Sequence, residues 1–333
     1  MRLAALLLTT AILTPQQDAV APPPPSPPFE AWLQGLIDEA RGRGYSVELI
    51  QSTLAGLTPI SRVVELDNSQ AEFTITFDRY YQTRVSPRVV RLGREHAAQQ
   101  RTLLQQIESA YGVPSSTVLA IWGLESRYGE LTGTYPVFQS LATLAFEPRR
   151  AQFFRRELFN ALTIVSSGYI DAKTMTGSWA GAMGQPQFMP SSYLDHAVDF
   201  DKDGLRDIWR SQPDTLASIA NYLKAAGWEM GQTWGREVRI SEKARAGIAD
   251  IPLRDAGCSA KRQMTERRPL GIWADAGVLL KDGAPLPQSD MPASLVEVSG
   301  HSFLTYPNYD ALLAYNCAHL YALSVGLLAD QIR

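Results

Sequence analysis

Cysteine and histidine are scarce in this sequence, and neither sign of charge is in large excess. Its 333 residues include only two cysteines and four histidines. The histidines do not recur at metal-ligand spacing, so each is expected to be structural. The net charge of -3 argues against nucleic acid as a partner. With 45% hydrophobic and 20% charged residues, the chain is long and apolar enough to form one large folded unit with a substantial core.

One stretch combines an apolar helical pattern with a single carboxylate. Pro114 and Gly129, residue types typical of a helix start and a helix end, enclose it. Within it Val118, Trp122 and Glu125 fall at i, i+4 and i+7, so the acid shares a stripe with apolar residues. Desolvation and the negative end of the helix dipole both favour the protonated acid, so we expect a raised pKa for Glu125, in the range of a general acid. The alternative is a glutamate at the edge of the stripe with its carboxylate in water.

A second stretch, from Gly177 to Tyr193, is rich in glycine, alanine, serine and glutamine. Its small residues let the backbone approach a ligand closely, and its hydroxyls and amides are neutral hydrogen-bonding groups. Trp179, Phe188 and Tyr193 add flat aromatic faces. This mixture suits a sugar, which has hydroxyls and an apolar C–H face, better than a phosphate or a metal. A glycine-rich turn packed between helices would explain the same residues.

These stretches belong to a longer series of motifs that resembles the soluble lytic transglycosylases of the membrane-bound lytic transglycosylase B family, which cleave peptidoglycan. The series comprises Ala120–Gly129, Ser140–Phe146 with Arg149 and Arg150, Gly177–Tyr193, Asp199–Gly204, Ala217–Trp228, Tyr315 with Asn316, and Tyr321 with Ala322. Because the motifs keep this order over about 200 residues, the set is far more specific than any one motif.

The resemblance implies a mainly α fold of the α+β class. It consists of a lysozyme-like helical core with a helical accessory subdomain and a small β-containing subdomain. We expect the catalytic domain over residues 29–333, with the core at about 88–235, the β-containing subdomain at about 236–305 and a closing helix at about 310–332. Two short runs in the β-containing part, Glu237–Ile240 and Ala293–Val298, are typical of strands.

The resemblance also implies roles for single residues. Glu125 is the catalytic residue, and no catalytic cofactor is implied. The substrate-binding residues are Ser178, Gln187, Tyr222, Tyr315, Tyr321 and Tyr80. Tyr80 is the best match to a tyrosine that approaches the sugar, although Tyr81 adjoins it. The partner is the peptidoglycan glycan strand, and the protein is expected to be a monomer.

The expected chemistry follows from missing acids. Most glycosidases place two carboxylates around the scissile bond, but this chain has no acid between Asp171 and Asp195. Glu130, Asp171 or Glu157 could still fold back into the site. The resemblance implies that one glutamate suffices for the MurNAc-GlcNAc β-1,4 bond. Glu125 first protonates the glycosidic oxygen while the N-acetyl group assists at the anomeric carbon, and it then takes the proton of the sugar's own 6-hydroxyl, which closes a 1,6-anhydro ring.

Two other functions fit the same residues. A hydrolytic muramidase would share Glu125 but use water, and it would release a reducing end. A non-catalytic wall-binding protein would bind the glycan without turnover. The intact Glu125 and the glycine-rich stretch favour an enzyme over the binding protein.

The N-terminal residues predict export. Residues 1–21 carry one basic residue, an apolar run too short to span a membrane, and a small-x-small site, a pattern typical of a signal peptide. Residues 22–28 form a Pro-rich linker. No cysteine lies near this region, so we expect no lipid or membrane anchor and a periplasmic protein.

An acidic loop predicts a structural calcium site. The predicted ligands are Asp199, Asp201, Asp203, the carbonyl of Leu205, and Asp214. The first three acids occupy positions 1, 3 and 5 of an EF-hand loop, and a glycine follows at position 6. Arg210 stands at position 12 in place of the usual bidentate Glu. Family members with a longer loop take this ligand later, which implies Asp214, with Asp207 as a substitute. An acidic turn without metal would have the same pattern.

The two cysteines are Cys258 and Cys317. Export would allow a disulfide between them, and two buried free thiols fit the sequence equally well. Because Cys317 lies beside Tyr315 in the sequence, a disulfide could brace the predicted sugar site.

Overall fold

The computed structural model describes residues 27–69 and 75–333. The expected signal peptide (1–21) and most of the expected linker (22–28) therefore lie outside the described residues. The described chain carries helices α1 to α15 and seven short strands, β1 to β7, so the predicted mainly α fold of the α+β class is confirmed.

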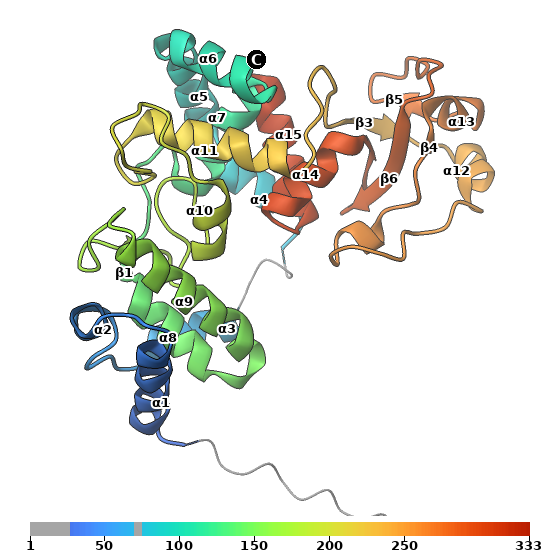
Figure 1. Ribbon diagram of the computed structural model, residues 1–333. Helices are drawn as coiled ribbons and strands as arrows, with labels where there is room; N and C mark the ends of the chain where they lie inside the picture. The colour runs from blue at the N-terminus through green and yellow to red at the C-terminus, as the bar shows by residue number, and fades with distance from the viewer. Residues whose placement is uncertain (1–26, 70–74) are drawn as a thin grey trace, which may run out of the picture.

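The accessory part of the molecule is helical and takes elements from two separate stretches of the chain (Figure 1). Its helices are α1 (Phe29–Gly42), α2 (Val47–Thr53), α3 (Ser61–Asn68), α8 (Val137–Phe146) and α9 (Ala151–Ser166). They share one apolar core that includes Leu36, Leu141 and Leu158. Thus α8 and α9, which fall in the expected core at about 88–235, pack with the N-terminal helices. The nearly buried Asp67 fixes this arrangement, because Arg149 and Arg150, between α8 and α9, both pair with it.

The central helix is α7 (Ser115–Ser126). It is surrounded by α5 (Pro87–Gln99), α6 (Arg101–Tyr111), α11 (Gln212–Ala225) and α15 (His319–Ile332) (Figure 1). Ten of its 12 residues are buried. The sequence pattern predicted that one side of this helix is buried, but all of its sides are. This agrees with its nearly continuous apolar sequence. It also ends before Gly129, because Arg127 and Tyr128 adopt left-handed φ angles of 51° and 62°.

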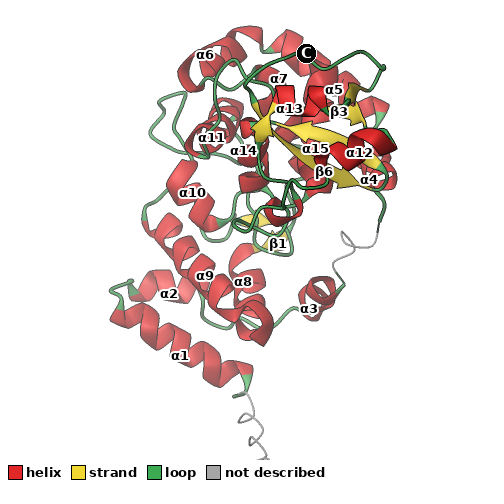
Figure 2. Cartoon of the chain, turned by 90° about the vertical axis from the view of Figure 1, so that its right-hand side faces the viewer, coloured by secondary structure: helices red, strands yellow, loops and turns green. Residues whose placement is uncertain are grey.

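The β-containing subdomain is built on an antiparallel sheet with the strand order β4-β6-β7-β3-β5. Its strands are β3 (Gly235–Arg239), β4 (Arg268–Pro269), β5 (Leu279–Leu280), β6 (Pro292–Val298) and β7 (His301–Thr305), with α12 (Glu242–Ile248) and α13 (Leu270–Asp275) beside them. The two predicted strands correspond to β3 and β6. In Figure 2 the sheet lies at the opposite end of the molecule from α1 and α2. A separate apolar core, with Trp273 and Tyr306 at its centre, stabilises this subdomain.

The remaining elements connect these parts. They are α4 (Phe77–Arg84), α10 (Pro190–His196), α14 (Pro307–Tyr315), and the two-stranded pair β1 (Tyr135–Pro136) and β2 (Thr176–Gly177). Proline or an N-capping hydroxyl starts each of these three helices: Thr76 accepts from Arg79 N at the start of α4, and Pro190 and Pro307 occupy the first turns of α10 and α14.

The predicted closing helix at about 310–332 is wrong as a single element. The chain instead forms α14 and α15, which are bent by 117°. Asn316 and Ala318 have extended φ angles of -147° and -142°, so the helical hydrogen bonds are interrupted between them. Cys317 lies in this break and is bonded to Cys258 in a disulfide. Periodicity alone missed the break, because leucines continue on both sides of it.

By length and composition, no single helix of the described residues could cross a membrane, and only the bent pair α14–α15 could do so together.

The disulfide generates a stability prediction. Replacing both Cys258 and Cys317 by serine removes a cross-link between residues 59 positions apart. We expect the free energy of unfolding to fall by about 2–4 kcal/mol, because the open chain gains conformational entropy when it unfolds. Urea unfolding of the double variant and of the oxidised wild type measures the difference. Alkylation of both thiols in denatured protein that has not been reduced would contradict the bridge.

Candidate active site

Glu125 is the penultimate residue of α7, and its side chain is half-buried. It is the last acidic residue before the helix ends, near the partial negative charge of the carbonyl terminus. The surrounding helix packs so closely that Val118, Ile121 and Trp122 have no exposed surface. The position of the carboxylate is therefore set by a rigid, buried element and not by a loop.

Three tyrosines gather around this end of α7. Tyr321 lies beside Glu125. Tyr321 stacks on Tyr315 with ring centroids 6.4 Å apart, and Tyr315 lies 4.7 Å from the ring of Tyr222. Burial, together with the nearby charge of Glu125, raises the pKa of Tyr315 and of Tyr321 well above the usual tyrosine value. Both phenols therefore stay neutral and can donate hydrogen bonds at any physiological pH.

The tyrosines come from three elements whose ends meet at the site. Tyr222 lies on α11, Tyr315 ends α14, and Tyr321 lies in the first turn of α15. The hydroxyl of Tyr222 donates to the carbonyl of Ala314 at 2.7 Å, and the hydroxyl of Tyr315 donates to the carbonyl of Pro186 at 2.7 Å. The break between α14 and α15 is what allows Tyr315 and Tyr321 to face the same carboxylate.

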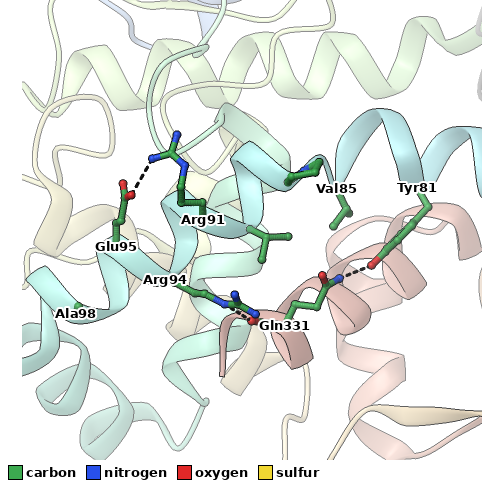
Figure 3. Close-up of a pocket in the computed structure, with 9 residues that line it drawn as sticks. Tyr81, Val85, Arg91, Arg94, Glu95, Ala98 and Gln331 are labelled. Atoms are coloured by element: carbon green, nitrogen blue, oxygen red, sulfur yellow. Dashed lines mark hydrogen bonds and ion pairs between the residues drawn. The ribbon is translucent and has the colours of Figure 1, made fainter.

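The structure separates the two adjacent tyrosines of α4. Tyr80 is 6% exposed and lines a cavity of about 540 Å³ together with Tyr321, Asn316 and His319. Tyr81 instead lines a different cavity of about 590 Å³, between α4, α5 and α15 (Figure 3). There its hydroxyl accepts a hydrogen bond from Gln331. The geometry thus brings Tyr80, and not Tyr81, to the Glu125 side of α4.

The glycine-rich stretch runs directly against the chain that follows α7. A Cβ atom on Gly133 would lie 2.1 Å from the carbonyl oxygen of Gly177, so only glycine allows the two backbones to come this close. Gln187 joins the same two segments, because its Nε2 donates to the carbonyl of Thr132 at 3.0 Å and to that of Gly184 at 2.8 Å. The Oγ of Ser178 accepts from the N–H of Ala182 at 3.1 Å. These bonds fix the two predicted substrate-binding side chains on one rigid turn.

Other polar and aromatic residues of this stretch point inward and are not available to a sugar. Phe188 and Tyr193 are 2% and 0% exposed, so the prediction that they offer flat faces to a ligand is wrong. Both belong to the apolar core shared with the accessory helices. Of the three aromatic residues, only Trp179 is half-buried. A sequence pattern reports residue types, but not which face of a turn meets the core.

The three acids that could have supplied a second carboxylate are held elsewhere. Glu130 is exposed and pairs with Arg88 at 2.8 Å. Glu157 is 3% exposed and accepts from the N–H and the hydroxyl of Ser191, both at 2.8 Å. Asp171 is exposed and accepts from the N–H of Lys173 at 2.8 Å. None of these three interactions involves Glu125 or the tyrosines beside it.

Four of the predicted metal ligands converge. Carboxylate oxygens of Asp199, Asp201, Asp203 and Asp214 all lie within 4.8 Å of one another. Gly204, at position 6 of the loop, has a φ of 92°, which explains why glycine is needed there. The N–H of Leu205 donates to Asp203 at 2.8 Å, so Leu205 lies in the same turn.

The buried Asp214 is the residue predicted to replace the missing ligand at position 12, and it lies among the converging acids. Its two oxygens accept from the N–H groups of Phe200 at 2.7 Å and of Asp207 at 2.8 Å. Burial, and also the charge of Asp201, raises the pKa of Asp214. Asp207 itself binds the Nε of Arg210 at 2.9 Å and is not among the four converging acids. The donor set is all oxygen and carries several negative charges close together, which fits a calcium ion.

Sequence reasoning missed some residues that shape the site. By residue type, Gln185 is one more neutral side chain of the glycine-rich stretch, but the structure buries its amide against Trp122. Thr132 and Gly133 carry no signal beyond an ordinary turn, since their role depends on a partner more than forty residues away along the chain.

Comparison with known proteins gives a consistent result. A family model described as the transglycosylase SLT domain matches residues 28–330. Membrane-bound lytic murein transglycosylase B of Escherichia coli (strain K12) is 30% identical over 302 residues, which is 87% of this chain and 79% of that protein.

Two solved structures are also similar. SltB3 from Pseudomonas aeruginosa, in complex with NAG-anhNAM-pentapeptide, is 43% identical with a TM-score of 0.82, over 91% of this chain and 79% of that chain. The Escherichia coli lytic transglycosylase Slt35, in complex with calcium, is 29% identical with a TM-score of 0.74, over 92% of each chain.

The contact between Gly133 and Gly177 predicts a specific loss of stability. Gly133→Ala should lower the free energy of unfolding by about 1–3 kcal/mol more than Gly283→Ala, because the added methyl group overpacks the contact. Gly283 is the matched control: its φ of 93° resembles the 90° of Gly133, but a Cβ there meets no atom within 4 Å. Urea unfolding measures both. Equal losses would show that the strain of the positive φ, and not the close contact, accounts for the effect.

Proposed function

This chain belongs to the transglycosylase SLT domain family, and from this premise we propose that Glu125 is the single catalytic residue of its reaction. The protein is a lytic murein transglycosylase, a glycosidic-bond lyase that acts on peptidoglycan. It cleaves the MurNAc-GlcNAc β-1,4 bond without water and leaves 1,6-anhydro-muramic ends.

One observation carries the assignment of Glu125. It is the acid that lies among the tyrosines at the end of the buried α7, whereas Glu130, Glu157 and Asp171 have partners elsewhere. A hydrolase would need a second carboxylate to activate water or to act as the nucleophile. The arrangement instead fits a mechanism in which one carboxyl group serves twice.

In the first step, the carboxyl group of Glu125 donates its proton to the glycosidic oxygen, and the bond to the anomeric carbon breaks. The N-acetyl group of the same muramic acid assists by attacking the anomeric carbon from the opposite side. Tyr321, which lies beside this carboxyl group, orients it. Its neutral phenol also stabilises the carboxylate that remains after the proton has left.

In the second step, the Glu125 carboxylate accepts the proton of the sugar's 6-hydroxyl, whose oxygen bonds to the anomeric carbon as the bond from the N-acetyl oxygen to that carbon breaks. This closes the 1,6-anhydro ring and restores the carboxylic acid for the next turnover. Well-oriented intramolecular groups reach effective concentrations of about 10⁵ M or more, well above the concentration of bulk water. A held 6-hydroxyl therefore reacts faster than water that lacks a base to activate it.

The remaining site residues are proposed to bind the glycan. Ser178 and Gln187 stand on the rigid turn that faces the end of α7, and they supply hydrogen bonds to the sugar. Tyr222, Tyr315, Tyr321 and Tyr80 supply the aromatic side of the site, where the C–H face of a sugar can stack.

The site of action is proposed to be the periplasm. The export pattern of residues 1–21 and the location of the wall substrate both support this.

A structural calcium ion is proposed at the acidic loop, with Asp199, Asp201, Asp203, the carbonyl of Leu205 and Asp214 as ligands. The convergence of four carboxylates supports it, because a divalent cation offsets their mutual repulsion. The structure of Slt35 in complex with calcium adds a precedent in a similar protein. When bound, the ion would hold the loop in place and take no part in proton transfer.

The role of Glu125 predicts a large effect from a small change. Glu125→Gln keeps the size of the side chain but removes proton transfer, so kcat on purified peptidoglycan should fall by about 10⁴-fold or more. Glu130→Gln is the matched control, since it removes an exposed acid five residues away that pairs with Arg88. It should change kcat little, because surface ion pairs contribute little. Full activity in Glu125→Gln would refute the assignment.

The calcium proposal predicts a ligand-dependent stability. Calcium added to chelated protein should raise the free energy of unfolding, by about 2.7 kcal/mol when free calcium is 100 times its Kd. Asp214→Asn should abolish this increase, whereas Asp207→Asn should retain it, because Asp207 lies outside the converging acids. Thermal unfolding with and without calcium measures both variants. An increase that survives in Asp214→Asn and disappears in Asp207→Asn would assign the last ligand to Asp207.

A further inference from the structure

The side chain of Gln185 connects two parts of the active site. It is 6% exposed, and both ends of its amide are bonded. Its Oε1 accepts from the indole Nε1 of Trp122 at 2.9 Å, and its Nε2 donates to the carbonyl of Trp209 at 3.0 Å. Its backbone N–H donates to the carbonyl of Ile208 at 2.9 Å. Both ends of the amide and the backbone N–H of Gln185 thus hold other residues of the protein.

Trp122 connects Gln185 to Glu125, the proposed catalytic residue. It precedes Glu125 by three residues, so the two side chains lie on adjacent turns of the same side of α7. Its ring has no exposed surface and packs between His96 and Tyr128, with centroids 4.8 Å and 5.3 Å away. A shift of the indole ring is therefore transmitted to the last turn of α7.

The chain around Gln185 holds the substrate side of the same site. Pro186 accepts the hydrogen bond from Tyr315, and Gln187 donates to Thr132. Gly129 packs on the amide itself, since a Cβ there would lie 2.6 Å from the Oε1 of Gln185. One short segment thus touches α7, the turn after α7 and α14.

We propose that Gln185 is a positioning residue that acts through Trp122 to fix the Glu125 carboxylate relative to the residues that bind the glycan. The proposal rests on the role of Glu125 proposed above. An apolar side chain of similar size would fill the same space but would leave the buried indole N–H of Trp122 and the carbonyl of Trp209 unpaired. The end of α7 would then move to satisfy them, and a carboxylate displaced by about 1 Å loses about 100-fold in rate.

The first test is Gln185→Met, assayed on purified peptidoglycan. We expect kcat to fall by about 10- to 100-fold while KM changes much less, because the glycan still binds and the acid is misplaced. Gln139→Met is the matched control, because the amide of Gln139 bonds the carbonyl of Thr58 at 2.9 Å within the accessory part. It should leave kcat unchanged. An unchanged kcat in Gln185→Met would overturn the proposal.

The second test asks whether the effect passes through Trp122. The variants Gln185→Met and Trp122→Phe each remove one partner of the same hydrogen bond. The double variant should have the same kcat as the more impaired of the two single variants, because the hydrogen bond can be lost only once. Effects on kcat that multiply in full would show that Gln185 acts by another route, and the proposal would fail.

The third test does not depend on the stability of the methionine variant. In Gln185→Glu, the protonated carboxyl group reproduces both contacts, since it can accept from Trp122 and donate to Trp209. The ionised form can only accept, so the contact with the Trp209 carbonyl is lost. Burial raises the pKa of the introduced group. Activity should therefore approach that of the wild type at low pH and fall as pH rises through this pKa.

Comparison with the wild type shows whether the introduced carboxyl group of Gln185→Glu causes the pH dependence. The neighbouring titratable residues, His96 and Tyr128 beside Trp122 and Asp207 beside Trp209, are present in both proteins. A pH profile of kcat that runs parallel to that of the wild type would overturn the proposal. If Glu125→Gln were fully active, the assignment of Glu125 as the catalytic residue would be refuted. An inactive Glu125→Gln combined with a fully active Gln185→Met would refute only the positioning role.

Discussion

The close backbone contact between the glycine-rich stretch and the end of α7 is the constraint on which the site depends. Gly133 and Gly177 have no room for a Cβ between them, and this closeness lets Gln187 reach Thr132 and Gln185 reach Trp122. Helix α7 is buried because its sequence is apolar on all sides, and this backbone contact sets its position against the glycine-rich stretch. The remaining parts of the fold, including the sheet, hold α14 and α15 so that their tyrosines close the same site.

The chemistry of the site follows from a carboxyl group in neutral surroundings. Burial and the charge of Glu125 raise the pKa of Tyr315 and of Tyr321, so neutral phenols, and not a second ionised group, lie beside the acid. The acids that could have activated water form bonds to Arg88, Ser191 and Lys173 instead. A single proton-transfer group can serve both steps only if the nucleophile is already part of the substrate, as the 6-hydroxyl is.

Local sequence signals predicted the elements but not the long-range contacts between them. The strands β3 and β6, the helix around Glu125 and the acidic turn all carry patterns readable within a dozen residues. The break at Cys317 was not predictable from periodicity, because apolar residues continue through it. The inward orientation of Phe188 and Gln185 depends on cores and partners far away along the chain. The choice between Tyr80 and Tyr81 likewise required the packing of α4 against α15.

The most direct test of the single-glutamate account is the fate of oxygen from water. Sacculi are digested by the purified protein in water enriched in the heavy oxygen isotope, and the released muropeptides are analysed by mass spectrometry. Because the sugar's own 6-hydroxyl closes the ring, the anhydro ends should carry no heavy oxygen. One heavy oxygen for each cleaved bond, at a new reducing end, would contradict the single-glutamate mechanism and would require a base that activates water.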